Sequence, residues 1–132
     1  MKQDSRPINV SVTDLAVFKW PIMAIASIPH RVSGALLFFG VGFMLFALDM
    51  SLSSEAGFET MKSLMATPVG MFVTWVLLSC LAYHFVAGFK HLAMDMGIAE
   101  TLEGAQIASA TTLFLSAILI GLAALWVIWG GF

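Results

Sequence analysis

Charged residues are scarce in this chain of 132 residues: Asp, Glu, Lys and Arg make up only 11% of positions, against 60% hydrophobic residues. They are missing altogether from residues 32–48, 63–89 and 104–132. About 20 apolar residues in a helix cross roughly 30 Å of hydrocarbon, and the second and third stretches are long enough to do so. This pattern excludes an ordinary soluble globule and predicts an all-α integral membrane protein with three transmembrane helices.

Cysteine is nearly absent as well. The chain has one, Cys80, in the middle of the second charge-free stretch, so an internal disulfide framework is excluded. A lone cysteine among apolar neighbours is typical of a small packing residue. Neither fold nor function is expected to depend on thiol chemistry.

The first charge-free stretch is short, and the uncharged residues 21–29 lengthen it on the N-terminal side of Arg31. We therefore predict one transmembrane domain over 1–132, with an N-terminal arm at 1–20 and spans at about 22–49, 68–94 and 106–129. Pro29 leaves two possibilities for the first span. The helix either begins near Ile22 and is kinked at Pro29, or begins near Ser27 with that serine as its N-cap.

The loop between the first and second spans has its own apolar period. Phe58, Met61 and Met65 recur at helical spacing, which predicts a short helix lying on the membrane surface.

Basic residues are absent after Lys90, and they are unevenly distributed before it. Four precede or open the first span, one lies between the first two spans, and one closes the second: Lys2, Arg6, Lys19, Arg31, Lys62 and Lys90. Cytoplasmic loops of membrane proteins carry the excess of Lys and Arg. The N-terminal arm and the loop after the second span are therefore predicted to be cytoplasmic, and the C-terminus to lie outside.

Polar residues inside the spans line up at helical spacing. Two stripes repeat at i, i+4, i+7 and i+11, one made of His84, Gly88, His91 and Asp95 and the other of Ser27, Arg31, Gly34 and Phe38. His30 stands beside the second stripe. Both stripes lie toward the predicted cytoplasmic side, so we expect them to face one site.

His84 lies roughly 9 Å deeper than Lys90, so it is expected to be neutral and to have a partner. A neutral imidazole is a good metal ligand, and Gly88 one turn away leaves room for a flat macrocycle, which together suggest haem iron. His91 lies about 10.5 Å along the helix from His84, whereas two axial nitrogens on one iron are about 4 Å apart. A second axial ligand would then come from a partner subunit.

Each of these residues also has a plainer possible role. A single histidine in a span can serve only as a hydrogen-bonding group between helices, and Arg31 can simply anchor the end of its span. Ser27 can be only a helix cap, and Asp95 only a surface charge.

Three segments together resemble the cytochrome b membrane-anchor subunit of succinate dehydrogenase (complex II), the larger of its two small anchors. They are RPINVSV near the N-terminus, SIPHRVSG at the first span, and the pattern H-x-x-x-G-x-K-H-L-x-x-D that starts at His84. The resemblance covers nearly the whole chain. It departs from the family at Lys90, where relatives commonly carry arginine, because lysine keeps the charge but lacks the planar fork for a bidentate contact.

The resemblance implies that His84 is an axial ligand of haem b, with the second axial histidine on the other anchor subunit. It also implies that His30, Arg31 and His91 meet the haem propionates. The implied partners are that second anchor, an iron–sulfur subunit and a flavoprotein subunit, in the lipid of a bacterial inner membrane. A nucleic-acid partner is not expected.

The resemblance further implies that Ser27 and Arg31 line the site where ubiquinone is reduced, with Asp95 or His91 on the path of the protons. No residue of this chain would be catalytic by itself, because electrons from succinate arrive through the other subunits. Two alternatives remain open: the anchor of a quinol:fumarate reductase, and a non-enzymatic tether or transporter subunit whose histidines serve helix packing or proton relay.

The distribution of basic residues leads to a testable prediction of the membrane topology. A reporter that is active only outside the cytoplasm, fused after Phe132, is expected to be active. The same reporter fused after Met96, in the loop that follows Lys90, is the control and should be silent. Activity in the opposite pattern would reverse the predicted orientation.

Overall fold

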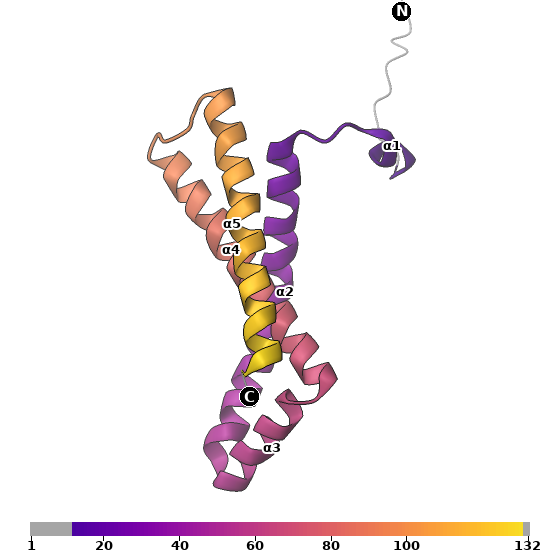
Figure 1. Cartoon of the computed structure of the whole chain (residues 1–132). Coiled ribbons are helices and arrows are strands. Elements are labelled where there is room, and N and C mark those ends of the chain that lie inside the picture. The colour runs from indigo at the N-terminus through magenta and orange to yellow at the C-terminus, as the bar shows by residue number, and fades with distance from the viewer. Residues whose placement is uncertain (1–11, 131–132) are drawn as a thin grey trace, which may run out of the picture.

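The computed structural model describes residues 12–130 (Figure 1), so the RPINVSV segment up to residue 11 and the last two residues lie outside the described part. Five helices follow one another: α1 (Val12–Val17), α2 (Ile22–Ser53), α3 (Glu55–Met65), α4 (Pro68–Asp95) and α5 (Leu102–Trp129). Helices α2, α4 and α5 are long and apolar enough to cross a membrane. The all-α fold with three spans is thereby confirmed, while the cytoplasmic placement of the arm stays a prediction.

The residues that flank the spans explain where the helices begin. Pro21, in an extended conformation, precedes α2, and its fixed φ suits a helix start. Thr67 and Thr101 are the N-caps of α4 and α5, and their hydroxyls accept hydrogen bonds from the amides of Gly70 and Gly104 at 3.0 and 3.1 Å. Each cap satisfies an amide that the first helical turn leaves without an internal partner.

Helix α2 runs without interruption from Ile22 to Ser53 and includes Pro29. Of the two possibilities that the sequence left open, the structure therefore has the one that begins at Ile22. Ser27 lies inside the helix and is not its N-cap. That serine's hydroxyl is then free for a role other than capping.

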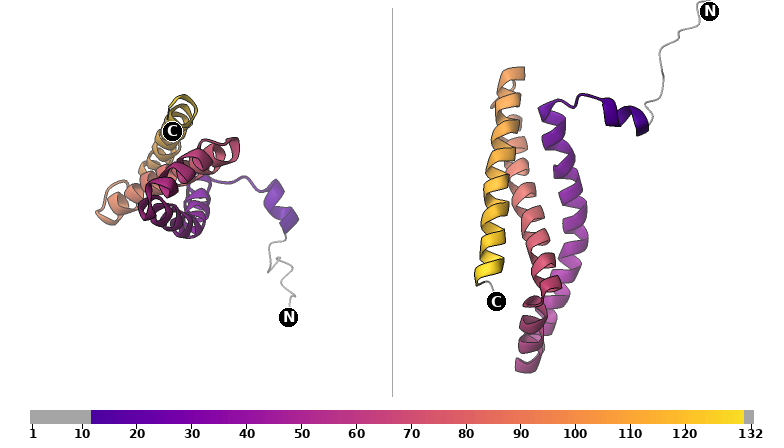
Figure 2. Two further views of the ribbon diagram at one scale, coloured as in Figure 1. Left: turned by 90° about the horizontal axis from the view of Figure 1, so that it is seen from below. Right: turned by 45° about the vertical axis from the view of Figure 1, so that its right-hand side comes forward.

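Helix α4 packs against both α2 and α5, and α5 also touches α2. Figure 2 shows α4 between the other two, with the start of α2, the end of α4 and the start of α5 at the same end of the bundle. Helix α3 lies at the opposite end, next to α2 and α4, where Met61 is buried. The short helix predicted around Met61 thus exists, and its position on the membrane surface stays a prediction.

Small residues fill the contacts between the spans. The side chains buried in the three long helices are Ala26, Ser33 and Gly40 on α2, Tyr83 and Ala87 on α4, and Ala105, Ser109, Thr112, Ser116 and Val127 on α5. Because lipid chains are as apolar as leucine, close approach through small residues drives such packing rather than burial of large ones. The large apolar side chains accordingly lie mostly outside, as Phe38 does at 77% exposed.

Among the buried residues that the structure describes in the three long helices, Tyr83 is the one large polar side chain. Its hydroxyl donates a 2.8 Å hydrogen bond to the carbonyl oxygen of Ala26, and this bond is buried. A hydroxyl in a water-free interior needs such a partner, so the bond ties α4 to α2 one turn before His30.

Replacing Tyr83 by phenylalanine removes this bond and keeps the ring. We expect the free energy of unfolding to fall by about 0.6 kcal/mol, a typical value for hydrogen bonds between membrane helices. The measurement is the midpoint of detergent-induced unfolding of the purified complex. Tyr83→Leu is the control, since it also removes the ring and should cost more; no loss in Tyr83→Phe beside a clear loss in Tyr83→Leu would assign the stabilisation to the ring alone.

Candidate functional site: a cluster of three histidines

Three imidazole rings from two helices stack near the end of the bundle where α2 begins. His30 of α2 lies between two histidines of α4, with ring centroids 4.3 Å from His84 and 5.2 Å from His91. The planes of these pairs differ by 30° and 31°. Within the described residues these are all the histidines, and we call them the histidine cluster. The expectation that both spans contribute to one place therefore holds for His30, His84 and His91.

Gly34 makes this interdigitation possible, whereas a Cβ at Gly88 would make only an ordinary van der Waals contact. A side chain at Gly34 of α2 would put its Cβ 2.9 Å from His84 Cε1, which is too close for two carbon atoms. A Cβ at Gly88 of α4 would lie 3.8 Å from His30 Nε2. Each ring thus lies over a glycine of the opposite helix. The sequence suggested Gly88 as room for a macrocycle, and in the structure the His30 imidazole lies there.

His84 is held by its Nδ1 atom. This nitrogen lies 3.2 Å from the carbonyl oxygen of His30 and 3.4 Å from Ser33 Oγ, and the Ser33 hydroxyl itself donates to the same carbonyl at 2.9 Å. Because a carbonyl oxygen only accepts, the hydrogen bond requires that Nδ1 carry the proton. The lone pair of the neutral ring is then on Nε2, which makes Nε2 the atom available to a ligand.

His30 is the residue of the cluster whose ring lacks a hydrogen-bond partner at one buried nitrogen within the described chain. Its Nε2 atom is buried and has no hydrogen-bond partner within residues 12–130. A buried polar atom without a partner costs roughly 1–3 kcal/mol, so native structures rarely leave one unless something else binds it. His30 Nε2 therefore marks a point where the site is incomplete in this chain alone.

Ser27 and Arg31 do not join the histidine cluster. Helix α2 contacts α4 through the face that carries Ala26, His30 and Ser33, and the stripe of Ser27 and Arg31 lies one residue further around the helix. Ser27 is half-buried and Arg31 exposed, and neither side chain hydrogen-bonds to a residue of the described chain. Both are free to meet a molecule from outside.

On α4, the polar stripe that runs from His84 to Asp95 becomes more exposed toward the C-terminal end of the helix. His84 and Gly88 are half-buried, whereas His91 and Asp95 are exposed. Asp95 is the last residue of α4 and forms no ion pair with any residue in the described range. The stripe thus connects the half-buried end of the cluster with the surface of the bundle.

Two residues of this site were missed in the sequence. Ser33 and Tyr83 are buried beside the histidines, and both hydrogen-bond across or along the α2–α4 contact. The signal that could have found Ser33 is the spacing of Ala26, His30 and Ser33, which repeats at i, i+4 and i+7. Tyr83 is the chain's single tyrosine and directly precedes His84.

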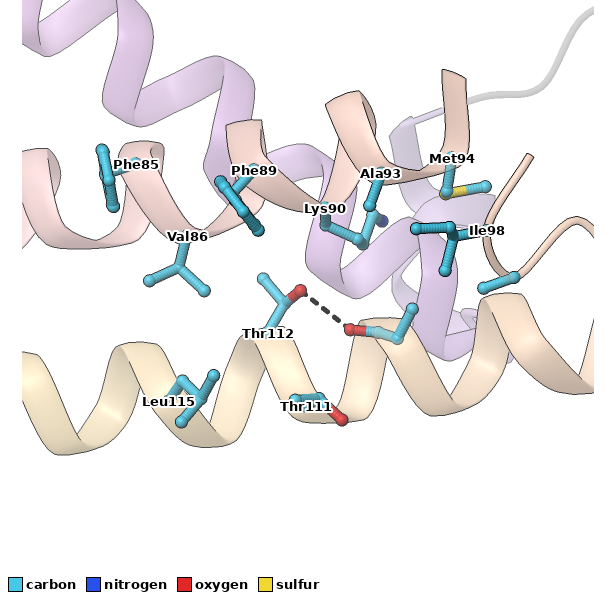
Figure 3. A pocket seen from close by; sticks show the side chains of 12 residues that line it. Phe85, Val86, Phe89, Lys90, Ala93, Met94, Ile98, Thr111, Thr112 and Leu115 are labelled. Atoms are coloured by element: carbon cyan, nitrogen blue, oxygen red, sulfur yellow. Dashed lines mark hydrogen bonds between the residues drawn. The ribbon is translucent and has the colours of Figure 1, made fainter. Parts of the chain in front are cut away.

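A cavity of about 420 Å³ lies elsewhere, between α4 and α5 (Figure 3). Phe85, Val86 and Phe89 line one wall, and Thr112 and Leu115 the other. Lys90 is its only charged lining residue, and none of the histidines reaches it. This cavity is therefore separate from the predicted site.

The sequence model of the family described as succinate dehydrogenase/fumarate reductase transmembrane subunit matches residues 3–123. This chain belongs to that family. The match extends over all three spans, and it confirms the resemblance that the segments around Ser27 and His84 carried. The chain is accordingly a multi-pass membrane protein and a non-catalytic anchor subunit of a dehydrogenase complex.

Named relatives agree with this assignment. The chain is 36% identical over 123 residues to the succinate dehydrogenase cytochrome b556 subunit of Coxiella burnetii (strain RSA 493 / Nine Mile phase I), covering 92% of this chain and 96% of that protein. It is 27% identical over 109 residues to the cytochrome b556 subunit of Paracoccus denitrificans, with 83% and 82% covered. It is 30% identical over 124 residues to the mitochondrial cytochrome b560 subunit of Sus scrofa, with 92% and 72% covered.

Proposed function

We propose that this chain, with a second small anchor subunit, holds haem b and forms part of the site where ubiquinone is reduced with electrons from succinate. The observation that carries the proposal is the hydrogen bond from His84 Nδ1 to the His30 carbonyl. Metal-ligating histidines usually donate their other ring N–H to a carbonyl or carboxylate, which orients the ring and raises its basicity as a ligand. His84 makes this hydrogen bond within this chain alone, without a bound metal.

In this proposal His84 Nε2 would be one protein ligand of the haem iron, and the partner anchor would supply the other. Within the described residues, no three His, Cys, Asp or Glu side chains are grouped so that they could together hold a metal ion. The donor set therefore fits a haem, whose macrocycle brings four nitrogens of its own, better than a bare ion. When bound, the haem supplies a one-electron redox centre inside the membrane.

The haem propionates are assigned to His30, Arg31 and His91. His30 Nε2 is buried and has no hydrogen-bond partner within the described residues. If this nitrogen carries the ring proton, a propionate carboxylate can accept a hydrogen bond from it. His91 and Arg31 are both exposed, and His91 lies with its ring centroid 5.2 Å from that of His30, the residue before Arg31. Donors to a carboxylate form strong, charge-assisted hydrogen bonds, most of all where water is scarce.

Ubiquinone is assigned to Ser27 and Arg31 because they share a face of α2 and have no partner within the described chain. The Ser27 hydroxyl donates a hydrogen bond to a quinone carbonyl oxygen. The Arg31 guanidinium stabilises the negative charge that develops on that oxygen, and this stabilisation is strong at low dielectric. Protons come from the cytoplasmic water by way of Asp95 or His91.

The proposed setting is a bacterial inner membrane with the N-terminus in the cytoplasm. There the iron–sulfur subunit, fed by the flavoprotein subunit, docks near the end of the bundle that carries the histidine cluster. The family description includes fumarate reductases, and the relatives named above are all succinate dehydrogenase subunits, which favours succinate as the electron donor.

The haem assignment is tested with His84→Leu in the complete membrane complex. Loss of an axial ligand should remove the haem or turn it high-spin, which a reduced-minus-oxidised optical spectrum reports. Leu92→Ala is the control, because it shortens an exposed side chain of the same helix that has no role in the proposed site, and it should leave the haem low-spin. An unchanged low-spin spectrum in His84→Leu would show that His84 is not the ligand, and a wild-type complex without haem bands would favour a tether or transporter subunit.

The quinone assignment is tested with Ser27→Ala. Loss of one hydrogen bond to the quinone oxygen should cost about 1–3 kcal/mol, which is roughly one to two powers of ten in the rate of quinone reduction. Succinate oxidation with an artificial acceptor that takes electrons upstream should not change, and neither should the haem spectrum. The control is Ser51→Ala at the other end of α2, where the hydroxyl bonds to the Ala47 carbonyl of its own helix at 2.7 Å.

Normal quinone reduction in Ser27→Ala would assign Ser27 to helix packing only. An equal loss of the upstream activity would mean that the substitution damages assembly instead of the site. Arg31→Leu should slow quinone reduction more than Ser27→Ala does, because it removes a charge as well as donors.

A further inference from the structure

Ser33 is the polar side chain most deeply buried beside the histidine cluster, with 5% of its surface exposed. Its hydroxyl contacts two polar groups, the His30 carbonyl oxygen at 2.9 Å and His84 Nδ1 at 3.4 Å. These two groups also bond to each other at 3.2 Å, so the three atoms form a closed triangle. Within residues 12–130, Ser33 is therefore the one side chain that hydrogen-bonds to both ends of the bond that orients His84.

We propose that Ser33 is a positioning residue that fixes the ring of His84 as a haem ligand, an inference that rests on the function proposed above. The Nδ1–H of His84 is shared between two acceptors, the His30 carbonyl and Ser33 Oγ. The Ser33 O–H donates to the same carbonyl, so Ser33 Oγ meets His84 Nδ1 as an acceptor and not as a donor. With both acceptors on one side, the ring keeps Nδ1 protonated and Nε2 unprotonated.

Steric contact completes the support. The His84 ring lies against Gly34, the residue that follows Ser33, with no Cβ to push it away. Ser33 and His30 hydrogen-bond to the Nδ1 edge of the ring, and its Cε1 edge lies against the α2 backbone at Gly34. Outer groups of this kind typically change metal affinity or activity by 10–100-fold when they are removed.

A purely structural role for Ser33 has a different signature. Serine hydroxyls inside helices commonly bond to a carbonyl of the preceding turn, which satisfies the hydroxyl and has no further effect. Ser109 of α5 is such a residue: it is 0% exposed and its hydroxyl donates to the Ala105 carbonyl at 2.8 Å. Ser109 therefore provides a matched control for the loss of a buried hydroxyl away from the histidines.

The experiment compares Ser33→Ala, Ser33→Thr and Ser109→Ala in the complete membrane complex. Three quantities are measured: the midpoint potential of the haem, the retention of haem against an excess of a haem-scavenging protein, and succinate oxidation with the upstream acceptor. The first two report the ligand environment, and the third reports whether the complex is assembled.

In Ser33→Ala the haem potential should rise, because an imidazole with a weaker hydrogen bond is less basic and stabilises the ferric form less. Haem affinity should fall by about 10-fold, the low end of the range, since the His30 carbonyl still accepts from Nδ1. Ser33→Thr keeps the hydroxyl and should stay close to wild type. Ser109→Ala should change neither quantity, and the upstream activity should persist in all three variants.

An unchanged potential and affinity in Ser33→Ala, with His84→Leu losing its low-spin haem, would overturn this inference and leave the proposed function intact. A low-spin spectrum that survives His84→Leu would overturn the proposed function itself. If Ser33→Ala does not assemble, Ser33→Cys replaces the hydroxyl by a thiol, whose sulfur accepts hydrogen bonds only weakly, and a wild-type potential there would again overturn the role of the hydroxyl.

Discussion

The carbonyl oxygen of His30 is the acceptor on which the histidine cluster depends. It lies in the first span, and it receives the Ser33 hydroxyl and the His84 ring nitrogen from two different helices. No water is present in the hydrocarbon to replace such a partner, so a ring nitrogen at this depth has to find its acceptor in the protein. The backbone of α2 provides it, and this requirement sets both the tautomer of His84 and the closeness of α2 to α4.

The same constraint explains why the interface between the spans is built from small side chains with a few polar ones. Tyr83 reaches across to Ala26 for its hydrogen bond, and Trp75 donates from its indole to the Ile120 carbonyl at 3.3 Å. Each polar contact joins α4 to a neighbouring span through a backbone carbonyl. Tyr83 and Trp75 of α4 thus find acceptors in the neighbouring backbones, while the faces that carry Phe38 and Phe85 stay outside.

The fold could be predicted because charge-free length is a strong signal. The three stretches without Asp, Glu, Lys or Arg gave the number of spans, and the spacing around Met61 gave a helix where α3 is found. Which face of a span meets its neighbour could not be predicted in the same way. Apolar residues surround α2 on all sides, so hydrophobic periodicity assigns no buried face, and the polar stripe through Ser27 and Arg31 lies beside the true contact through His30 and Ser33.

The fit of one ring against a glycine also contributes to how the helices are aligned. His84 lies over Gly34, where a Cβ would come within 2.9 Å of the ring, and His30 lies between the two histidines of α4. A slide of one helical turn, about 5.4 Å, would move the His84 ring off Gly34. The register of two otherwise apolar helices therefore depends in part on residues that also build the site. A shift of α2 along α4 would therefore also take the histidine cluster apart.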